Sequence, residues 1–180
     1  LGESVSIGSD GSIYVAGVTE GDLDGETRAN SGGQDVFISK FNSNGIKQWT
    51  KLVGVAGYYG GLHEIGIDIG NDDSICVTAN TNRDLDGETI SGGRDAFISK
   101  FNPDGEKQWT KLVGSNHADY ASGITTGLNG SIYIIGSTKG DLDGQINSGD
   151  EDAYISKFSP DGNKQWTKLL GSSAVDDARG

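Results

Sequence analysis

The chain has little of several residue types on which catalysis and cross-linking usually depend. Its 180 residues include one cysteine, two prolines, two histidines and no methionine. A single cysteine, Cys76, cannot form an internal disulfide, and a thiol inside a strand is expected to be buried and inert. Nucleophile elbows, phosphate-binding loops and paired Cys-x-x-Cys motifs are all missing from the sequence. These absences argue against the common classes of enzyme.

Positive charge is scarce as well. Fourteen lysines and arginines stand against 26 aspartates and glutamates, which gives a formal net charge of -12. Binding to nucleic acid phosphates or to an anionic membrane surface needs a basic surface, so neither partner is expected. Apolar runs stay well short of membrane-spanning length, so membrane insertion is not expected either. An acidic surface favours solubility, cation binding or both.

Glycine and internal repetition are what the sequence has in abundance. Thirty glycines without a collagen period indicate many tight turns between short strands. Three motifs each occur three times, 57 to 62 residues apart, which is typical of stacked copies of one supersecondary unit. The copies are Phe/Tyr-Ile-Ser-Lys-Phe at 37–41, 97–101 and 154–158, Gln-Trp-Thr-Lys-Leu at 48–52, 108–112 and 165–169, and Asp-Leu-Asp-Gly at 22–25, 84–87 and 141–144.

Each copy predicts four short strands and no helix. In the third copy, Asn129-Gly130 is a strong hairpin signal, and Pro160-Asp-Gly162 has the composition of a type I turn followed by a left-handed glycine. Four strands joined by tight turns form an antiparallel meander, and repeated meanders form a β-propeller. The strands expected in this copy are 123–128, 131–136, 153–158 and 164–170, with a long polar loop at 137–152. We therefore predict an all-β chain with three four-stranded blades of a partial propeller, at about 1–60, 61–119 and 120–180.

The motifs resemble a known family. Residues 11–17, the Gly-Gly-x-Asp-Val/Ala-Phe-Ile-Ser-Lys-Phe-Asn segments at 32–42 and 92–102, and Asp-Gly-x-Lys-Gln-Trp at 104–109 are similar to the bacterial seven-bladed β-propeller repeats called SBBP. The Asp-Leu-Asp-Gly variant is similar to copies in large secreted or surface proteins of cyanobacteria and other bacteria. The resemblance implies a propeller and an extracellular, cell-surface or periplasmic location. It implies no catalytic residues, because the family has no common activity.

The number of blades leaves two alternatives open. Three units do not close a propeller, which typically has four to eight blades. The chain begins and ends at nearly the same phase of the repeat, as a piece of a longer array would, and this favours further blades from the same parent chain. The alternative is oligomerisation, in which two chains form six blades around a two-fold axis.

Acidic residues gather in the loop that follows the second strand of each copy. The three loops, 22–35, 84–95 and 141–152, hold 13 of the 26 aspartates and glutamates. Calcium binds six to eight oxygens, and alternating carboxylates in a short loop supply them. The alternative is that the last aspartate of each loop only forms a local turn with backbone N–H groups. The candidate calcium ligands are Asp22, Asp24, Glu26, Asp35, Asp84, Asp86, Glu88, Asp95, Asp141, Asp143, Asn147 and Asp152.

The fourth strand of each copy alternates lysine, tryptophan and lysine, as in Lys107, Trp109 and Lys111. Lysines on an outer edge strand discourage edge-to-edge association, and their stems can cover the indole. From the whole pattern we predict a non-catalytic extracellular or surface scaffold that binds protein or glycan through the acidic loop face, with calcium as an ordering ion. A structural spacer is the alternative. An enzyme similar to the quinoproteins, suggested only by the short Asp-Gly-x-Lys-Gln-Trp segment, is favoured least.

Overall fold

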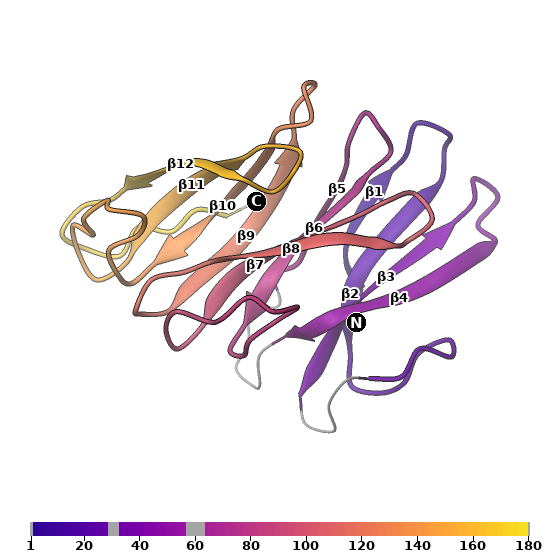
Figure 1. The fold of residues 1–180 in the computed structure, drawn as a ribbon, viewed down its shortest axis with the longest axis horizontal. Coiled ribbons are helices and arrows are strands. Elements are labelled where there is room, and N and C mark those ends of the chain that lie inside the picture. Colours follow the sequence, from indigo (N-terminus) through magenta and orange to yellow (C-terminus); the bar gives the residue numbers. More distant parts are fainter. Residues whose placement is uncertain (1, 29–32, 57–63, 180) are drawn as a thin grey trace.

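The computed structural model describes residues 2–28, 33–56 and 64–179, and all the regular elements in these ranges are β-strands (Figure 1). No helix in this part of the chain has the length and apolar content needed to cross a bilayer. The strands are β1 (Gly2–Ile7), β2 (Ile13–Thr19), β3 (Gln34–Phe41), β4 (Lys47–Ala56), β5 (Gly66–Ile69), β6 (Ile75–Thr81), β7 (Asp95–Phe101), β8 (Lys107–Val113), β9 (Asp119–Thr126), β10 (Ile132–Thr138), β11 (Asp152–Phe158) and β12 (Lys164–Leu170).

The strands form three separate antiparallel sheets, each in sequential order. The sheets β1–β4, β5–β8 and β9–β12 are called here the first, second and third blade. No described strand joins one sheet to another by ladder pairing, and Figure 1 shows the three sheets stacked side by side. This arrangement confirms the predicted all-β partial propeller. The inner strands β1, β5 and β9 contact one another in turn, so they line one common side of the stack.

The core lies between the blades because the strands alternate in burial. On β2, Tyr14, Ala16 and Val18 are buried and face the second blade, where they meet Ile75 and Phe97. A second cluster fills the space between the second and third blades. It contains Cys76, Ala96, Ile98, Val113, Ala121, Ile132, Ile134, Leu142, Tyr154 and Phe158. A single sheet has too little apolar surface to form a core alone, so each blade is stabilised mainly by its neighbours.

Tight turns fix the register of each sheet. In the third blade, the Gly130 N–H donates to the Gly127 carbonyl at 2.8 Å, and Gly130 has a φ of 75°. The turn between the third and fourth strands repeats the same device, with glycine at the left-handed position. Its φ is 77° at Gly45, 81° at Gly105 and 80° at Gly162. Left-handed φ is costly for residues with a Cβ, so glycine is the residue that these turns need. The predicted hairpins are therefore present where the sequence placed them.

Candidate functional site: the repeated acidic loops

The loop between the second and third strands of each blade contains a miniature hairpin. In the second blade, Leu85 and Glu88 exchange backbone hydrogen bonds of 3.0 and 2.9 Å across Asp86 and Gly87. Both central residues have positive φ, 52° at Asp86 and 86° at Gly87, which is the signature of a type I′ turn. The first and third blades repeat it at Asp24-Gly25 and Asp143-Gly144. The segments 20–33, 82–94 and 139–151 that contain these hairpins are called here the acidic loops.

The aspartate at the tip of each hairpin binds the fourth strand of its own blade. Asp86 accepts hydrogen bonds from Lys107 Nζ at 2.7 Å and from Thr110 Oγ1 at 2.5 Å. Asp24 accepts from Lys47 and Thr50, and Asp143 accepts from Lys164 and Thr167. The hydrogen bonds from Lys47 and then Thr50 lower the pKa of Asp24 below its usual value. The three carboxylates are therefore already neutralised by lysine and held in one position.

A buried serine extends each of these contacts into the sheet. Thr110 Oγ1 lies 2.8 Å from Ser99 Oγ, and both side chains are buried. Because the hydroxyl hydrogen of Thr110 goes to Asp86, Ser99 is the donor to Thr110. The first and third blades have the same pair, Ser39 with Thr50 at 2.8 Å and Ser156 with Thr167 at 2.7 Å. The loop, the fourth strand and the third strand are thereby connected in every blade.

The remaining acids of the hairpins make local contacts. Glu26 pairs with Lys51 at 2.8 Å and Glu88 with Lys111 at 2.6 Å, whereas the third blade has Gln145 at this position. The first aspartate of each loop accepts a backbone N–H six residues further on. These bonds run from Arg28 to Asp22 (3.1 Å), from Ile90 to Asp84 (3.0 Å) and from Asn147 to Asp141 (2.9 Å). The acids thus shape the loop in addition to giving it charge.

The aspartate that follows each acidic loop, at the start of the third strand, is buried in a different environment. Asp95 accepts the Ser91 N–H at 2.9 Å, and Asp152 accepts the Ser148 N–H at 2.9 Å, as the alternative of a local turn predicts. Asp35 is also buried, at the start of β3. Burial raises the pKa of Asp95. A Cβ on Gly114 would lie 2.1 Å from Asp95 Cγ, so this glycine leaves the space that the carboxyl group fills.

A further buried aspartate, Asp119, binds a serine in the same way at the start of β9, where the chain enters the third blade. Asp119 Oδ2 accepts the Ser115 N–H at 2.6 Å and the Ser115 hydroxyl at 2.9 Å, and its other oxygen accepts from Thr138. Burial raises its pKa, and the nearby Asp95 adds to the shift. Asp176 repeats this contact with Ser172 after β12. Neither residue was among the predicted site residues, although both follow a Gly-Ser segment that resembles the end of the acidic loop.

The predicted calcium ligands therefore fall into two sets. One set lies at the exposed hairpin tips and binds lysine, threonine or backbone N–H groups, and the other is buried at the start of the third strands. Asn147 belongs to neither set, because its side-chain amide donates to the Thr138 carbonyl at 3.0 Å and accepts the Gly149 N–H. Within residues 2–28, 33–56 and 64–179, no three histidine, cysteine, aspartate or glutamate side chains form a metal-binding group. Calcium binding by these residues stays a prediction.

The acidic loops of the second and third blades also pack on the preceding blade. Leu85, the residue before the hairpin tip, lies against the backbone of Gly54 in β4. A Cβ on Gly54 would be 2.5 Å from Leu85 Cδ1. Lys107 Nζ donates to the Val53 carbonyl at 2.7 Å and so crosses the same boundary. Leu142 is fully buried in the corresponding cluster between the second and third blades. The loops are thus part of the interface between blades.

Sequence reasoning missed the hairpin and the role of the lysines. Asp-Gly between two apolar or extended residues is a strong signal for a type I′ turn, and it was present three times. The lysines of the fourth strand were predicted to guard an outer edge. Their strands do lie at the outer edge of each sheet, and most of these lysines also reach the loop carboxylates. The equal recurrence of both motifs could have suggested this pairing.

Comparison with known proteins gives two findings. Residues 108–143 match the family model described as beta-propeller repeat (SBBP), a stretch that runs from β8 of the second blade to the hairpin tip of the third. Regulatory protein FlaEY of Caulobacter vibrioides is 31% identical over 188 residues, which cover 94% of this chain. The chain spans 19% of the length of that relative. The match to the repeat model confirms the predicted resemblance.

Proposed function

On the premise that this chain is built of SBBP-like beta-propeller repeats, we propose that it is a non-catalytic scaffold that binds another protein or a glycan through the acidic loop face. The observation that carries this proposal is the threefold repetition of one hydrogen-bonded hairpin. Each copy has the same hairpin, the same lysine and threonine contacts, and the same exposed aspartate before the tip. Three similar surfaces on one stack suit a ligand that is itself repeated, because linked weak contacts add up to strong binding.

The comparisons support the general part of this proposal, which is a scaffold without catalytic activity. The resemblance to the repeat family implies no common activity, and the relative from Caulobacter is named as a regulatory protein. Both favour a scaffold over an enzyme. The proposed location, at the cell surface or in secreted form, rests on the resemblance alone. The net charge of -12 suits a ligand with cationic groups and disfavours nucleic acid.

The test of binding compares two charge variants of the full chain on glycan arrays and on arrays of bacterial surface proteins. Asp22, Asp84 and Asp141 are changed together to asparagine, which keeps an oxygen for the backbone N–H and removes three exposed charges. The control changes Asp104 and Asp161 to asparagine in the turns at the other end of the blades. We expect the triple variant to lose at least about tenfold in affinity and the control to bind as the wild type does. Equal binding by all three proteins would refute a role for the loop face.

Calcium is the second part of the proposal, as an ion that orders the loops. Calcium would have to displace Lys107 from Asp86. Any gain in stability from calcium is therefore reduced by the loss of that ion pair. We expect calcium to raise the melting temperature of the wild type, and to raise it less in the variant with Asp84→Asn and Asp86→Asn, which keeps only the aspartates of the first and third loops. A wild-type melting temperature that is the same in calcium and in chelator would remove calcium from the mechanism.

The alternative function is a structural spacer, in which the blades only provide length and rigidity. It predicts that no ligand binds on any array. It also predicts that the loop variants are as stable as the wild type. An enzyme similar to the quinoproteins predicts cofactor absorbance in protein purified from its natural source. These outcomes separate the three functions without reference to a particular ligand.

A further inference from the structure

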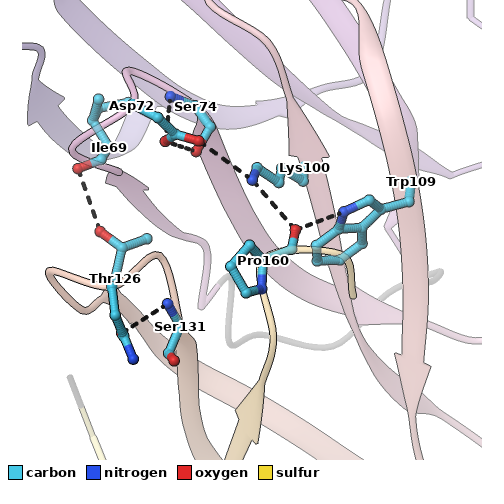
Figure 2. A network of polar contacts seen from close by, with 9 residues as sticks. Ile69, Asp72, Ser74, Lys100, Trp109, Thr126, Ser131 and Pro160 are labelled. Carbon is cyan, nitrogen blue, oxygen red and sulfur yellow. Dashed lines mark hydrogen bonds and ion pairs between the residues drawn. The ribbon is translucent and has the colours of Figure 1, made fainter. Parts of the chain in front are cut away.

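A clasp made of one lysine and one tryptophan joins the second blade to the third. Lys100 Nζ and Trp109 Nε1 both donate to the carbonyl of Pro160, each at 3.3 Å, so the second blade holds the turn between β11 and β12 (Figure 2). Lys40 Nζ donates to the Pro103 carbonyl, also at 3.3 Å, and thereby holds the corresponding turn of the second blade. These contacts lie at the end of the blades opposite to the acidic loops, and the junction between the second and third blades is closed by other groups at its loop end.

The loop end of this junction is built around Asp119, the first residue of β9. Its N–H donates to the Arg94 carbonyl of the second blade at 2.8 Å. Its Oδ2 accepts the N–H and the hydroxyl of Ser115, at 2.6 and 2.9 Å, and its Oδ1 accepts the hydroxyl of Thr138 in β10. Asp119 and Thr138 are fully buried, and Ser115 is buried as well. One carboxyl group thus joins the connection between the blades to the first two strands of the third blade.

The Asp119 carboxylate is not neutralised by a cation. In the part of the chain that the structure describes, no lysine or arginine forms an ion pair with it. Asp95, at the start of β7, is a second fully buried acid close to it. The charged or titratable side chains of the adjoining segments have other partners: Arg94 lies over the Tyr120 ring, Lys139 pairs with Glu151, His117 contacts Asn116, and Asp143 pairs with Lys164. A buried charge without a cation is costly.

Burial dominates the ionisation of Asp119. It raises the pKa of this carboxyl group in spite of the three hydrogen bonds, and the nearby Asp95 adds to the rise. Tyr154 of β11 brings no charge, because burial and then the nearby acids raise its pKa well above the usual value. A proton on Asp119 is therefore held more tightly in the closed junction than in water.

Thr138 connects this carboxyl group to the acidic loop of the third blade. Its Oγ1 lies within hydrogen-bonding reach of Asp119 Oδ1 and, at 2.9 Å, of the Gly140 carbonyl, but it has one hydrogen to donate. When Asp119 is ionised, the carboxylate takes this hydrogen. When Oδ1 carries a proton from solvent, it donates to Thr138 Oγ1, and the threonine turns its own hydrogen to the Gly140 carbonyl. The neutral form thus satisfies the same contacts without a buried charge.

We propose that Asp119 is a proton switch in the junction between the second and third blades. Uptake of one proton at Oδ1 removes the buried charge, tightens the junction and turns the Thr138 hydroxyl toward the acidic loop. Loss of the proton at higher pH loosens the junction and returns the hydroxyl to the carboxylate. This inference does not depend on what the acidic loops bind.

The pKa shifts give the direction of the pH dependence. The pKa of Asp119 is higher in the folded chain than in the unfolded chain, where an aspartate has a pKa of about 4. The stability that its proton contributes is therefore complete below about pH 4 and is lost as the pH rises through the folded pKa. Asp10, Asp24 and Asp72 have lowered pKa values and act in the opposite direction, but only below about pH 4. The two effects occupy separate pH ranges.

The test measures opening of the junction through Cys76, which lies in the cluster between these two blades. The full chain is labelled with 4,4′-dithiodipyridine from pH 5 to pH 8, and each rate is divided by that of the urea-unfolded chain at the same pH. Asp119→Asn keeps an oxygen for Ser115 and an amide donor for Thr138, so it imitates the protonated form. We expect the ratio of the wild-type rate to the variant rate to rise at least about threefold from pH 5 to pH 8, since one pKa unit corresponds to a tenfold change. Asp104→Asn, at an exposed position in a turn of the second blade, is the control and should follow the wild type.

Substitutions of Thr138 give a second test that leaves Asp119 in place, so the proposal stays testable if Asp119→Asn does not fold. Thr138→Val removes a hydrogen bond from the ionised carboxyl group, and the pH dependence of labelling should become larger and extend to higher pH. Thr138→Ser keeps the hydroxyl and should follow the wild type. Hydrogen exchange in the acidic loop at 139–151, corrected for its intrinsic pH dependence, should slow at low pH in the wild type and in Thr138→Ser but not in Thr138→Val.

Two results would overturn the proposal. The first is labelling whose pH dependence is the same in the wild type, in Asp119→Asn and in Thr138→Val, which would show that Asp119 takes up no proton in this range. The second is corrected exchange of the loop that does not change between pH 5 and pH 8 in the wild type, which would show that the Thr138 hydroxyl does not transmit the change.

Discussion

A buried hydroxyl pair links the acidic loop to the sheet in every blade. In the second blade, Ser99 donates to Thr110 and Thr110 donates to Asp86, while Lys107 supplies the positive charge. Each group has one role, because a hydroxyl has a single hydrogen to donate. At the scale of the residue, the acids of the loop are therefore structural partners of the fourth strand.

Replacing Thr110 with valine should destabilise the protein by about 1–3 kcal/mol. Valine keeps the shape of the side chain but leaves the buried Ser99 hydroxyl without its acceptor, and an unsatisfied buried polar group carries that cost. The oxygen of Asp86 that Thr110 contacts keeps its ion pair with Lys107. The free energy of unfolding from urea titration measures the loss. Thr89→Val, at an exposed threonine of the same loop, should change stability by less than about 0.5 kcal/mol. Equal effects at the two positions would show that the hydroxyl pair contributes nothing.

The hairpin in each acidic loop places one leucine against the preceding blade. Leu142 is fully buried between the second and third blades, whereas Leu23, at the same position of the first loop, is only half-buried. The same local sequence therefore has two environments. At the scale of the element, the contribution of the loop depends on whether a blade lies before it.

This difference predicts unequal costs for the same truncation. Leu142→Ala should lower the free energy of unfolding by about 2–5 kcal/mol, because it leaves a cavity in a packed interface. Leu23→Ala should cost about 1 kcal/mol, since much of the side chain already contacts water. Urea titrations of the two variants make the comparison. Losses of the same size would mean that the leucines act within their own blades and contribute little to the interfaces.

The elements could be predicted from sequence better than the contacts between them. The alternation of apolar and polar residues along a strand and the turn at Asn129-Gly130 both depend on local chemistry. The four-stranded repeat could therefore be predicted from the sequence. The acidic loop was interpreted through its charge, and the type I′ turn at Asp86-Gly87 was overlooked although its signal is local. The clasp on Pro160 could not be derived in this way, because it joins residues 51 and 60 positions apart and depends on the stacking of two blades.

Burial of Cys76 makes the single thiol a reporter of the whole stack. It lies in the cluster between the second and third blades, and burial raises its pKa to about 12. The thiolate that reacts with alkylating reagents is therefore almost absent near neutral pH in the folded protein. Modification requires that the two blades separate or that the chain unfolds.

We expect iodoacetamide at pH 8 to leave Cys76 of the native protein unmodified on the timescale on which it modifies the urea-unfolded chain completely. Trp109→Ala removes the clasp beside Cys76 and should speed labelling by at least about tenfold through easier opening. Trp49→Ala, which acts at the other interface, should have a smaller effect. Mass spectrometry of timed samples measures both rates. Rapid labelling of the native wild type would be incompatible with the packing between the second and third blades.

The direction of the clasp gives the stack a polarity that a pile of identical plates would lack. The first blade holds a turn of the second, and the second holds the same turn of the third, so a whole unit inserted between two others would meet a compatible surface on both sides. Lengthening by gene duplication would then need no adjustment elsewhere, whereas the loss of half a unit would leave a lysine and a tryptophan facing the wrong strand. Such an architecture can change its length in evolution while its junctions stay the same.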